Sequence, residues 1–254
     1  MRAPLSWLRE HADLPASVTG RGLAERLIAA GLEVETVERP GHDIDGPLVI
    51  GRVVTFEEET ASNGKTIRWC QVDVGEPEPR GIVCGARNFA VDDRVVVALP
   101  GATLPGGFAI TARTTYGHVS DGMICSAREL HVGDDHTGIL VLAGDLPVGA
   151  PAVDVLGLRD EVLDIAVTPD RGYCLSIRGI AREAATAYGV AFHDPAALDP
   201  LPIDGTGHGG EVDPAASVDR LVLRTVTGLD PAAQSPLWMQ RRLVLCVSCR
   251  RPIA

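Results

Sequence analysis

Apolar residues change their spacing along the chain, and the first forty residues begin with a helical period. Leu23, Leu27 and Ile28 fall on one face of a helix that Thr19 is placed to cap. Alternation of apolar and charged residues over positions 32–36 then predicts a strand with one face in water. The chain therefore opens with a helix followed by a strand.

Between about Leu48 and Leu142 the apolar residues form short runs separated by Gly, Pro, Asn and Asp. This pattern is typical of a small all-β barrel or sandwich. Ser126 and Glu129 form a capping box that predicts one short helix within it. The predicted strands lie at residues 48–56, 67–74, 81–84, 94–99, 108–112 and 138–142.

A mixed pattern returns after Pro151. A strand is predicted around Val162 and Ile165, and a helix over 175–188 that Gly189 ends. We expect these two elements to pack with the opening helix and strand into one discontinuous α/β unit. The β-rich module would then be inserted between its two halves.

The last sixty residues begin with a stretch that lacks the apolar periodicity of the preceding elements. Residues 194–218 are rich in Pro, Asp and Gly, which is typical of a linker. A strand is predicted over 221–229, and Ser235-Pro236 favours the start of a helix.

The overall charge is acidic. The 254 residues include 34 Asp and Glu against 23 Lys and Arg, for a formal net charge of -11, and Lys65 is the only lysine. Broad nonspecific adhesion to nucleic acid or to an anionic membrane needs a basic surface and is not expected. Aromatic residues make up only 4%, so Val, Leu, Ile and Ala must fill the core.

No targeting or membrane-spanning segment is expected. Glu10 and Asp13 interrupt any signal-peptide hydrophobic region, and Pro and Gly break the longest uncharged stretch, residues 95–112. The six cysteines do not follow the spacing of a secreted disulfide framework. A reducing cytoplasm is therefore the expected compartment.

The residues predict neither a catalytic centre nor a metal site. No phosphate-binding loop, dinucleotide-binding loop or nucleophile elbow occurs. Cys246 and Cys249 have C-x-x-C spacing, but no second pair or nearby His completes four ligands. His131 and His136 lie in a Gly/Asp loop, where solvated side chains are the simpler expectation.

Three loops of the β-rich module carry the most distinctive residues. Residues 82–88 end a strand in a Gly-containing turn that can present Arg87 and Asn88, residues 99–108 hold Pro-Gly turns, and residues 120–126 lead into the capping box. At these residues the sequence resembles the tRNA-binding oligonucleotide-fold (OB) domain appended to several aminoacyl-tRNA synthetases.

Further motifs follow one another as in the N-terminal part of the bacterial phenylalanyl-tRNA synthetase beta-subunit family, which the chain resembles over residues 1–245. They are Ser6-Trp7-Leu8, Thr168-Pro169-Asp170-Arg171-Gly172, Arg178-Gly179-Ile180-Ala181-Arg182-Glu183 and Ser235-Pro236-Leu237-Trp238.

The resemblance implies an α+β fold. An OB-fold tRNA-binding β-barrel, residues 40–150, would be inserted into a discontinuous α/β N-terminal domain, residues 1–39 and 151–195. A linker over residues 196–218 and a truncated start of the editing (B3/B4-like) domain over residues 219–254 would follow.

The resemblance also implies a function. The family is a cytoplasmic α2β2 ligase that joins phenylalanine to its tRNA with ATP and Mg²⁺, and the aminoacylation site lies on the alpha subunit. The expected partners are therefore tRNA and the alpha subunit. The chain alone is expected to bind no cofactor and to be inactive.

Two features depart from the family pattern. After residues 241–243 the chain lacks the family's Gly-Ile-Arg-Pro-like continuation, and we interpret its ending as that of a truncated or frame-shifted product. Residues 40–150 hold eight basic and fifteen acidic residues, a balance of -7. Since affinity for phosphates scales with the number neutralised, strong binding by this module alone is not expected.

A local basic face on the barrel remains the best candidate site, because OB folds bind through one face and its rim loops. Guanidinium groups there can fork onto phosphate or stack on bases. The alternative is that these are solvated charges and that the Asn satisfies its own turn. The candidate tRNA-binding residues are Lys65, Arg68, Arg87, Asn88 and Arg113.

Two other functions stay open at this point. The chain could be a free-standing tRNA-binding module that acts in trans, or the barrel could be a structural subunit-contact module.

Overall fold

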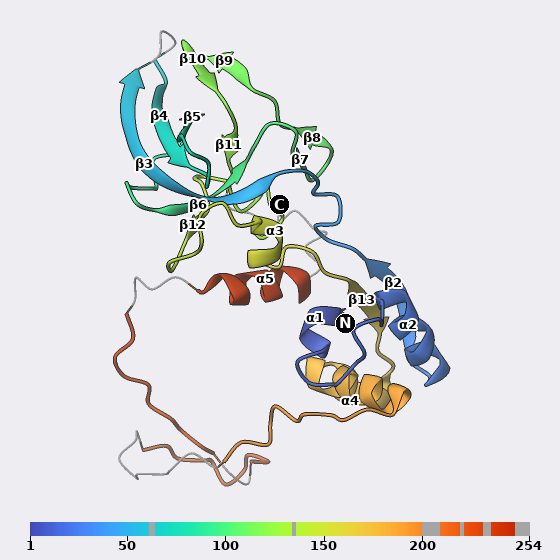
Figure 1. Ribbon diagram of the computed structural model, residues 1–254. Coiled ribbons are helices and arrows are strands. Elements are labelled where there is room, and N and C mark those ends of the chain that lie inside the picture. The colour runs from blue at the N-terminus through green and yellow to red at the C-terminus, as the bar shows by residue number, and fades with distance from the viewer. Residues whose placement is uncertain (61–63, 134–135, 200–208, 219–220, 231–234, 247–254) are drawn as a thin grey trace. The chain divides into compact units, whose positions relative to one another are not determined.

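The computed structural model describes the chain apart from residues 61–63, 134–135, 200–208, 219–220, 231–234 and 247–254 (Figure 1). Two compact units are present. The first is Met1–His193 with Pro236–Ala254, and the second is Asp194–Ser235.

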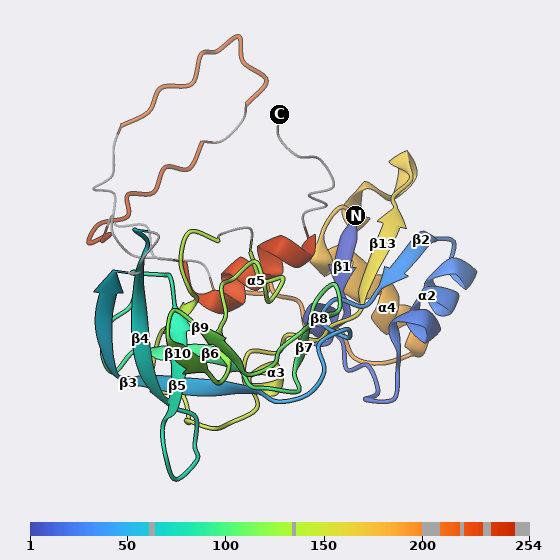
Figure 2. The same cartoon turned by 90° about the horizontal axis from the view of Figure 1, so that it is seen from above.

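The first unit contains a small antiparallel sheet built from both ends of its sequence. Its strand order is β1-β13-β2, and Figure 2 shows the three strands side by side. The pairing places Arg2 opposite Asp164 and Val37 opposite Leu163. The strands are β1 (Arg2–Pro4), β2 (Glu33–Glu38) and β13 (Val162–Ala166).

Helices cover this sheet and share its core. Leu8, Leu23 and Ile180 are fully buried in one cluster with residues of β13. The predicted Thr19 cap is confirmed, because its side chain accepts a hydrogen bond from the Gly22 N–H. The elements are α1 (Leu5–Leu8), α2 (Gly20–Ala29), the 3-10 helix η1 (Pro169–Cys174) and α4 (Ile177–Tyr188).

The β-rich residues form a nearly closed, OB-like antiparallel barrel. Its sheet runs β11-β6-β3-β4-β5, and β12 also pairs with β6. The Asp121 N–H donates to the Gly81 carbonyl at 2.8 Å and so brings the chain just before β11 back to β5. The strands are β3 (Leu48–Thr60), β4 (Thr66–Asp73), β5 (Arg80–Cys84), β6 (Arg94–Ala98), β11 (Met123–Ile124) and β12 (Val141–Leu142).

Short ribbons and a short helix complete the barrel region. As expected from the composition, its interior is largely aliphatic, with Ile50, Val53 and Val96 fully buried. The remaining elements are β7 (Thr103–Leu104), β8 (Phe108–Ala109), β9 (Arg113–Thr115), β10 (His118–Ser120) and α3 (Ala152–Val155).

The short helix predicted at the capping box is wrong, although the box itself forms. The Ser126 N–H donates to a Glu129 carboxylate oxygen at 2.6 Å, but the chain makes only a turn. His131 adopts a left-handed φ of 54°, and the Val132 N–H bonds back to the Ala127 carbonyl. The left-handed residue redirects the chain after this single turn, so no helix forms.

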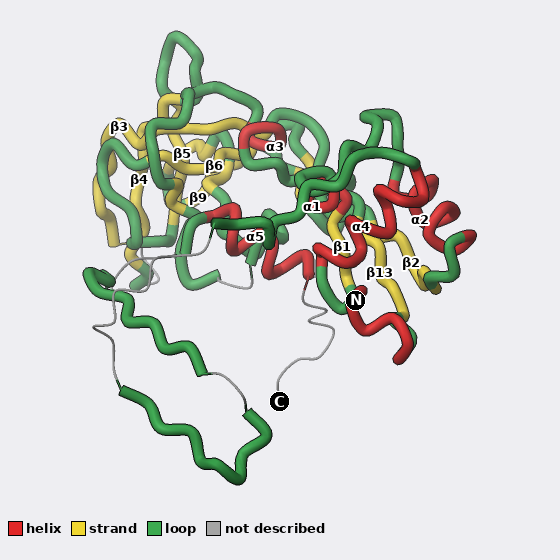
Figure 3. The backbone as a smooth tube through the Cα atoms, turned by 90° about the horizontal axis from the view of Figure 1, so that it is seen from below, coloured by secondary structure: helices red, strands yellow, loops and turns green. Residues whose placement is uncertain are grey.

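The second unit holds neither helix nor strand in its described residues (Figure 3). The strand predicted over 221–229 is therefore wrong. Leu221, Val222 and Leu223 are exposed, and no described strand pairs with them. A lone strand leaves its backbone groups without partners, so an apolar run with no neighbouring strand does not form a sheet.

The helix predicted from Pro236 is confirmed as α5 (Leu237–Cys246). It packs against β1, where the Arg2 side chain donates to the Leu245 carbonyl at 3.0 Å. This packing groups α5 with the first unit, whereas the expected division placed residues 219–254 in a domain of their own.

Asp160 connects three segments of the first unit. Its side chain is 3% exposed and accepts hydrogen bonds from the Ser6 N–H and hydroxyl and from the Glu161 N–H. Arg241 of α5 completes the set with an ion pair at 3.2 Å. A buried carboxylate is tolerated here because donors surround it.

Candidate nucleic-acid interface

Two hollows lie next to each other on the barrel surface and share Gly85. We call the first the basic hollow; its volume is about 630 Å³. It is lined by Lys65, Thr66, Ile67, Val83, Gly85, Arg87, Arg113, Thr114, Thr115 and Tyr116.

Strand pairing gathers the cations of the basic hollow. In the antiparallel pair β4–β5, Arg68 faces Cys84. The residues before β4 and those after β5 therefore emerge at the same end of the sheet, which brings Lys65 near Arg87. The β9–β10 hairpin supplies Arg113, and the Val83 N–H donates to the hydroxyl of Ser120 in β10 at 3.1 Å.

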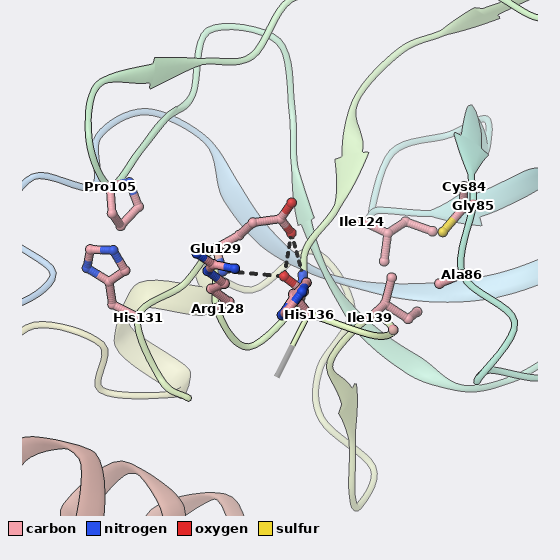
Figure 4. Close-up of a pocket in the computed structure, with 12 residues that line it drawn as sticks. Cys84, Gly85, Ala86, Pro105, Ile124, Arg128, Glu129, His131, His136 and Ile139 are labelled. Atoms are coloured by element: carbon pink, nitrogen blue, oxygen red, sulfur yellow. Dashed lines mark hydrogen bonds between the residues drawn. The ribbon is translucent and has the colours of Figure 1, made fainter. Parts of the chain in front are cut away.

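The second hollow, which we call the histidine hollow, has a volume of about 580 Å³. Figure 4 shows Pro105 and His131 at one end and Cys84, Gly85 and Ala86 at the other. It is lined by Cys84, Gly85, Ala86, Pro105, Ile124, Ser126, Arg128, Glu129, His131, His136, Gly138 and Ile139.

The floor and rim of the histidine hollow differ in chemistry. Cys84, Ile124 and Ile139 are buried and apolar, with exposures of 5 to 8%. Arg128 and His131 are exposed. An apolar floor with a few polar groups at the edge is the usual composition of a ligand site.

The structure gives Arg68 a different environment from the one expected. Its side chain is 12% exposed and forms an ion pair with Glu58 at 2.9 Å. It also donates to the Phe89 carbonyl at 2.6 Å and lies over the rings of Phe56 and Phe89. Arg68 thus holds strands and loop together and does not line either hollow.

Asn88 also makes structural contacts. Its amide nitrogen donates to the Ile139 carbonyl at 2.8 Å, and its amide oxygen accepts from the Ile139 N–H at 3.0 Å. This pair of bonds fixes the loop after β5 to the segment before β12. Asn88 positions the hollows and does not line them, whereas Lys65, Arg87 and Arg113 are brought together.

The barrel's eight basic residues divide into two sets. The first, which we call the paired arginines, forms ion pairs: Arg52 with Asp73 and Asp92, Arg68 with Glu58, Arg80 with Glu76 and Asp121, and Arg94 with Asp145. The second, which we call the hollow cations, lines the two hollows: Lys65, Arg87, Arg113 and Arg128.

Positive charge is therefore concentrated at the hollows, although the module is acidic. Within the described part of the chain, the side chains of Arg87, Arg113 and Arg128 make no ion pair or hydrogen bond with protein groups. Glu129 is the only acid among the described lining residues, and its carboxylate accepts from the Ser126 N–H and hydroxyl.

The cysteines near the hollows are not poised as nucleophiles. Burial raises the pKa of the Cys84 thiol, and it raises that of Cys70 to about 12. Both thiols are therefore protonated at neutral pH.

The described residues also contain no group of three metal-binding side chains, and Cys249 lies outside them. None of the described helices is both long and apolar enough to cross a membrane.

Sequence reasoning missed Arg128, His131 and Tyr116 as lining residues. Arg128 sits inside the capping box, whose pattern explains its neighbours but says nothing about Arg128 itself. His131 carries the left-handed φ of 54° that turns the chain at the hollow. A left-handed non-glycine residue is uncommon, but only the structure reveals it.

Comparison with known proteins agrees with this geometry. Residues 48–151 match the family model described as a putative tRNA binding domain. Over 252 residues the chain is 62% identical to the phenylalanine--tRNA ligase beta subunit of Thermobifida fusca, and over 248 residues it is 58% identical to that of Streptomyces avermitilis. The chain is similar to the N-terminal part of phenylalanine--tRNA ligase beta subunits.

The extent of the match is asymmetric. It covers 97% and 96% of this chain but only 30% of each beta subunit. Among solved structures, the chaperone CsaA from Bacillus anthracis is 14% identical with a TM-score of 0.31, and the match covers 41% of this chain and 86% of that one.

Proposed function

We propose that this chain supplies a tRNA-binding surface to a phenylalanine--tRNA ligase, as the N-terminal part of its beta subunit. The observation that carries the proposal is the sorting of the barrel's cations. The paired arginines are neutralised by acids, whereas the hollow cations line two neighbouring hollows that share Gly85. The side chains of Arg87 and Arg113, which make no ion pair or hydrogen bond with protein groups in the described part of the chain, are available to replace the counterions of RNA phosphates.

The wider assembly belongs to the same proposal. The alpha subunit joins the beta subunit in an α2β2 enzyme of the cytoplasm, carries the aminoacylation site and uses ATP and Mg²⁺. The present chain binds neither. Residues 1–39 and 151–195 form a discontinuous α/β domain around the inserted barrel of residues 40–150, and the pairing of β1 and β2 with β13 supports this division.

The test is a binding measurement on the full chain. Fluorescence anisotropy with labelled tRNA would compare the wild type with the double variant Arg87→Ala/Arg113→Ala over a series of salt concentrations. We expect roughly tenfold or greater loss of affinity, and a decrease of about two in the slope of log K against log salt.

A matched control comes from helix α2. Arg21→Ala/Arg26→Ala removes the same charge from exposed positions outside the barrel and is expected to keep the wild-type slope. If both double variants bind tRNA equally, the hollow cations are not the site, and a structural subunit-contact role for the barrel is favoured.

A further inference from the structure

Gly85 is the residue that the two hollows share. Neither its backbone conformation nor its surroundings require glycine at this position. Its φ lies outside the left-handed region, and a Cβ built on it would meet no atom within 4 Å. Gly81 in β5 and Gly138 in the histidine hollow differ from Gly85 in this respect. A Cβ at Gly81 would collide with the Trp69 ring at 2.1 Å, and one at Gly138 with the Asn88 amide at 2.3 Å.

Glycine at such a position suits the close approach of a ligand to the backbone. Glycine costs more chain entropy on folding than any other residue, so a site that any residue could occupy gains no stability from it. Gly85 is exposed and lines both hollows, so the backbone there is not covered by a side chain of its own. A ligand that occupies both hollows can pass directly over this exposed backbone.

The two hollows suit different parts of a nucleotide. Phosphates fit the basic hollow, where Lys65, Arg87 and Arg113 lie and no described acid is present. The histidine hollow contains the Glu129 carboxylate, which disfavours a phosphate. Its apolar floor of Ile124 and Ile139 instead suits the flat face of a base.

We propose that an unpaired stretch of the bound tRNA crosses Gly85, with its phosphates in the basic hollow and an unstacked base in the histidine hollow. Arg128 and His131 at the rim then stack on the base or donate to its edge. This inference rests on the proposed function. It requires an unpaired segment, because a base within a duplex cannot turn its face into a hollow of the protein.

The first experiment blocks the crossing without changing charge. Gly85→Leu places a branched side chain in the open space above the backbone, and tRNA affinity is expected to fall roughly tenfold or more. Gly209→Leu is the matched control. It is also exposed, has ordinary φ and open space at its Cβ, and lies in the second unit; wild-type affinity is expected.

The second experiment uses the wild-type chain, so it does not depend on the folding of a variant. Single-stranded RNA of twelve nucleotides and a duplex of the same strand compete against labelled tRNA. We expect the single strand to compete roughly tenfold better.

The outcomes separate this inference from the proposed function. If the wild-type chain binds no tRNA, or if Arg87→Ala/Arg113→Ala leaves binding intact, both fail. If that double variant loses binding while Gly85→Leu retains it, or if duplex competes as well as single strand, the crossing at Gly85 is refuted and the tRNA-binding surface stands.

Discussion

The paired arginines and the hollow cations occupy the same barrel and have the same side-chain chemistry, yet they have different environments. Arg68 and Arg94 are 12% and 18% exposed and contact acids, carbonyls or rings. Arg87 and Arg113 are exposed and contact no acid among the described residues. The net charge of an entire module therefore does not indicate where on its surface an anion can bind, because it does not distinguish paired from unpaired cations.

Pairing explains why the balance of -7 over residues 40–150 does not exclude a basic surface. Seven of the acids are already engaged by the paired arginines or by His118: Glu58, Glu59, Asp73, Glu76, Asp92, Asp121 and Asp145. The four paired arginines offset four of these negative charges, which weakens the field of the engaged acids beyond the Debye length of roughly 8 Å. Of the described acids only Glu129 lines a hollow, so the other described acids of the module lie outside both hollows.

The largest expected effect comes from replacing one of the paired arginines. Arg68→Ala removes the donor to Glu58 and to the Phe89 carbonyl, and it removes the cation that lies over two rings. We expect the free energy of unfolding to decrease by about 3 kcal/mol, measured by urea denaturation. The folded fraction should bind tRNA as the wild type does; weaker binding at unchanged stability would place Arg68 with the hollow cations.

The next effect concerns Asn88, which lies in the loop after β5 beside Arg87. Asn88→Ala removes both hydrogen bonds to Ile139, with an expected loss of about 1.5 kcal/mol in the free energy of unfolding. Hydrogen exchange of the Ile139 amide should also accelerate, since that N–H loses its acceptor. Protection equal to the wild type would show that Asn88 does not hold the hollows in place.

The barrel could be predicted from the sequence because its turns depend on residues that are close together in the chain. Pro-Gly pairs and alternating strands specify short-range geometry, and the cap at Thr19 formed as predicted. The site was harder to predict. Arg68 and Arg87 look alike in sequence, and only the register of β4 against β5 and the packing of Phe89 decide which one is enclosed.

The strand predicted over 221–229 failed for a related reason. Its apolar run satisfies the local pattern, but a strand also needs a neighbour, and the sequence does not specify one. Contacts between distant parts of the sequence likewise determine that Arg128 and His131 line a hollow. Both line a hollow whose other walls come from residues 84–86 and 105.

A smaller effect is expected from a single hollow cation. Arg128→Ala should weaken tRNA binding by roughly fivefold and leave the salt slope nearly unchanged, because a contact to a base rather than to a phosphate is lost. The unfolding midpoint in urea should not move, since the side chain of Arg128 makes no ion pair or hydrogen bond within the described residues. A clear loss of stability would assign Arg128 to the structural set.

The smallest effect is the response of the paired set to acid. The Gly75 N–H, followed by Arg52, lowers the pKa of Asp73 below its unfolded value. Its contribution to stability is therefore fully present above the unfolded pKa of about 3.9 and is lost as the pH falls through the folded pKa. Asp73→Asn should remove part of the stability difference between pH 6 and pH 3 in urea unfolding while leaving tRNA affinity at pH 7 unchanged. An unchanged acid response in the variant would mean that Asp73 does not contribute to it, and a gain of tRNA affinity would mean that the paired acids still oppose the hollow cations.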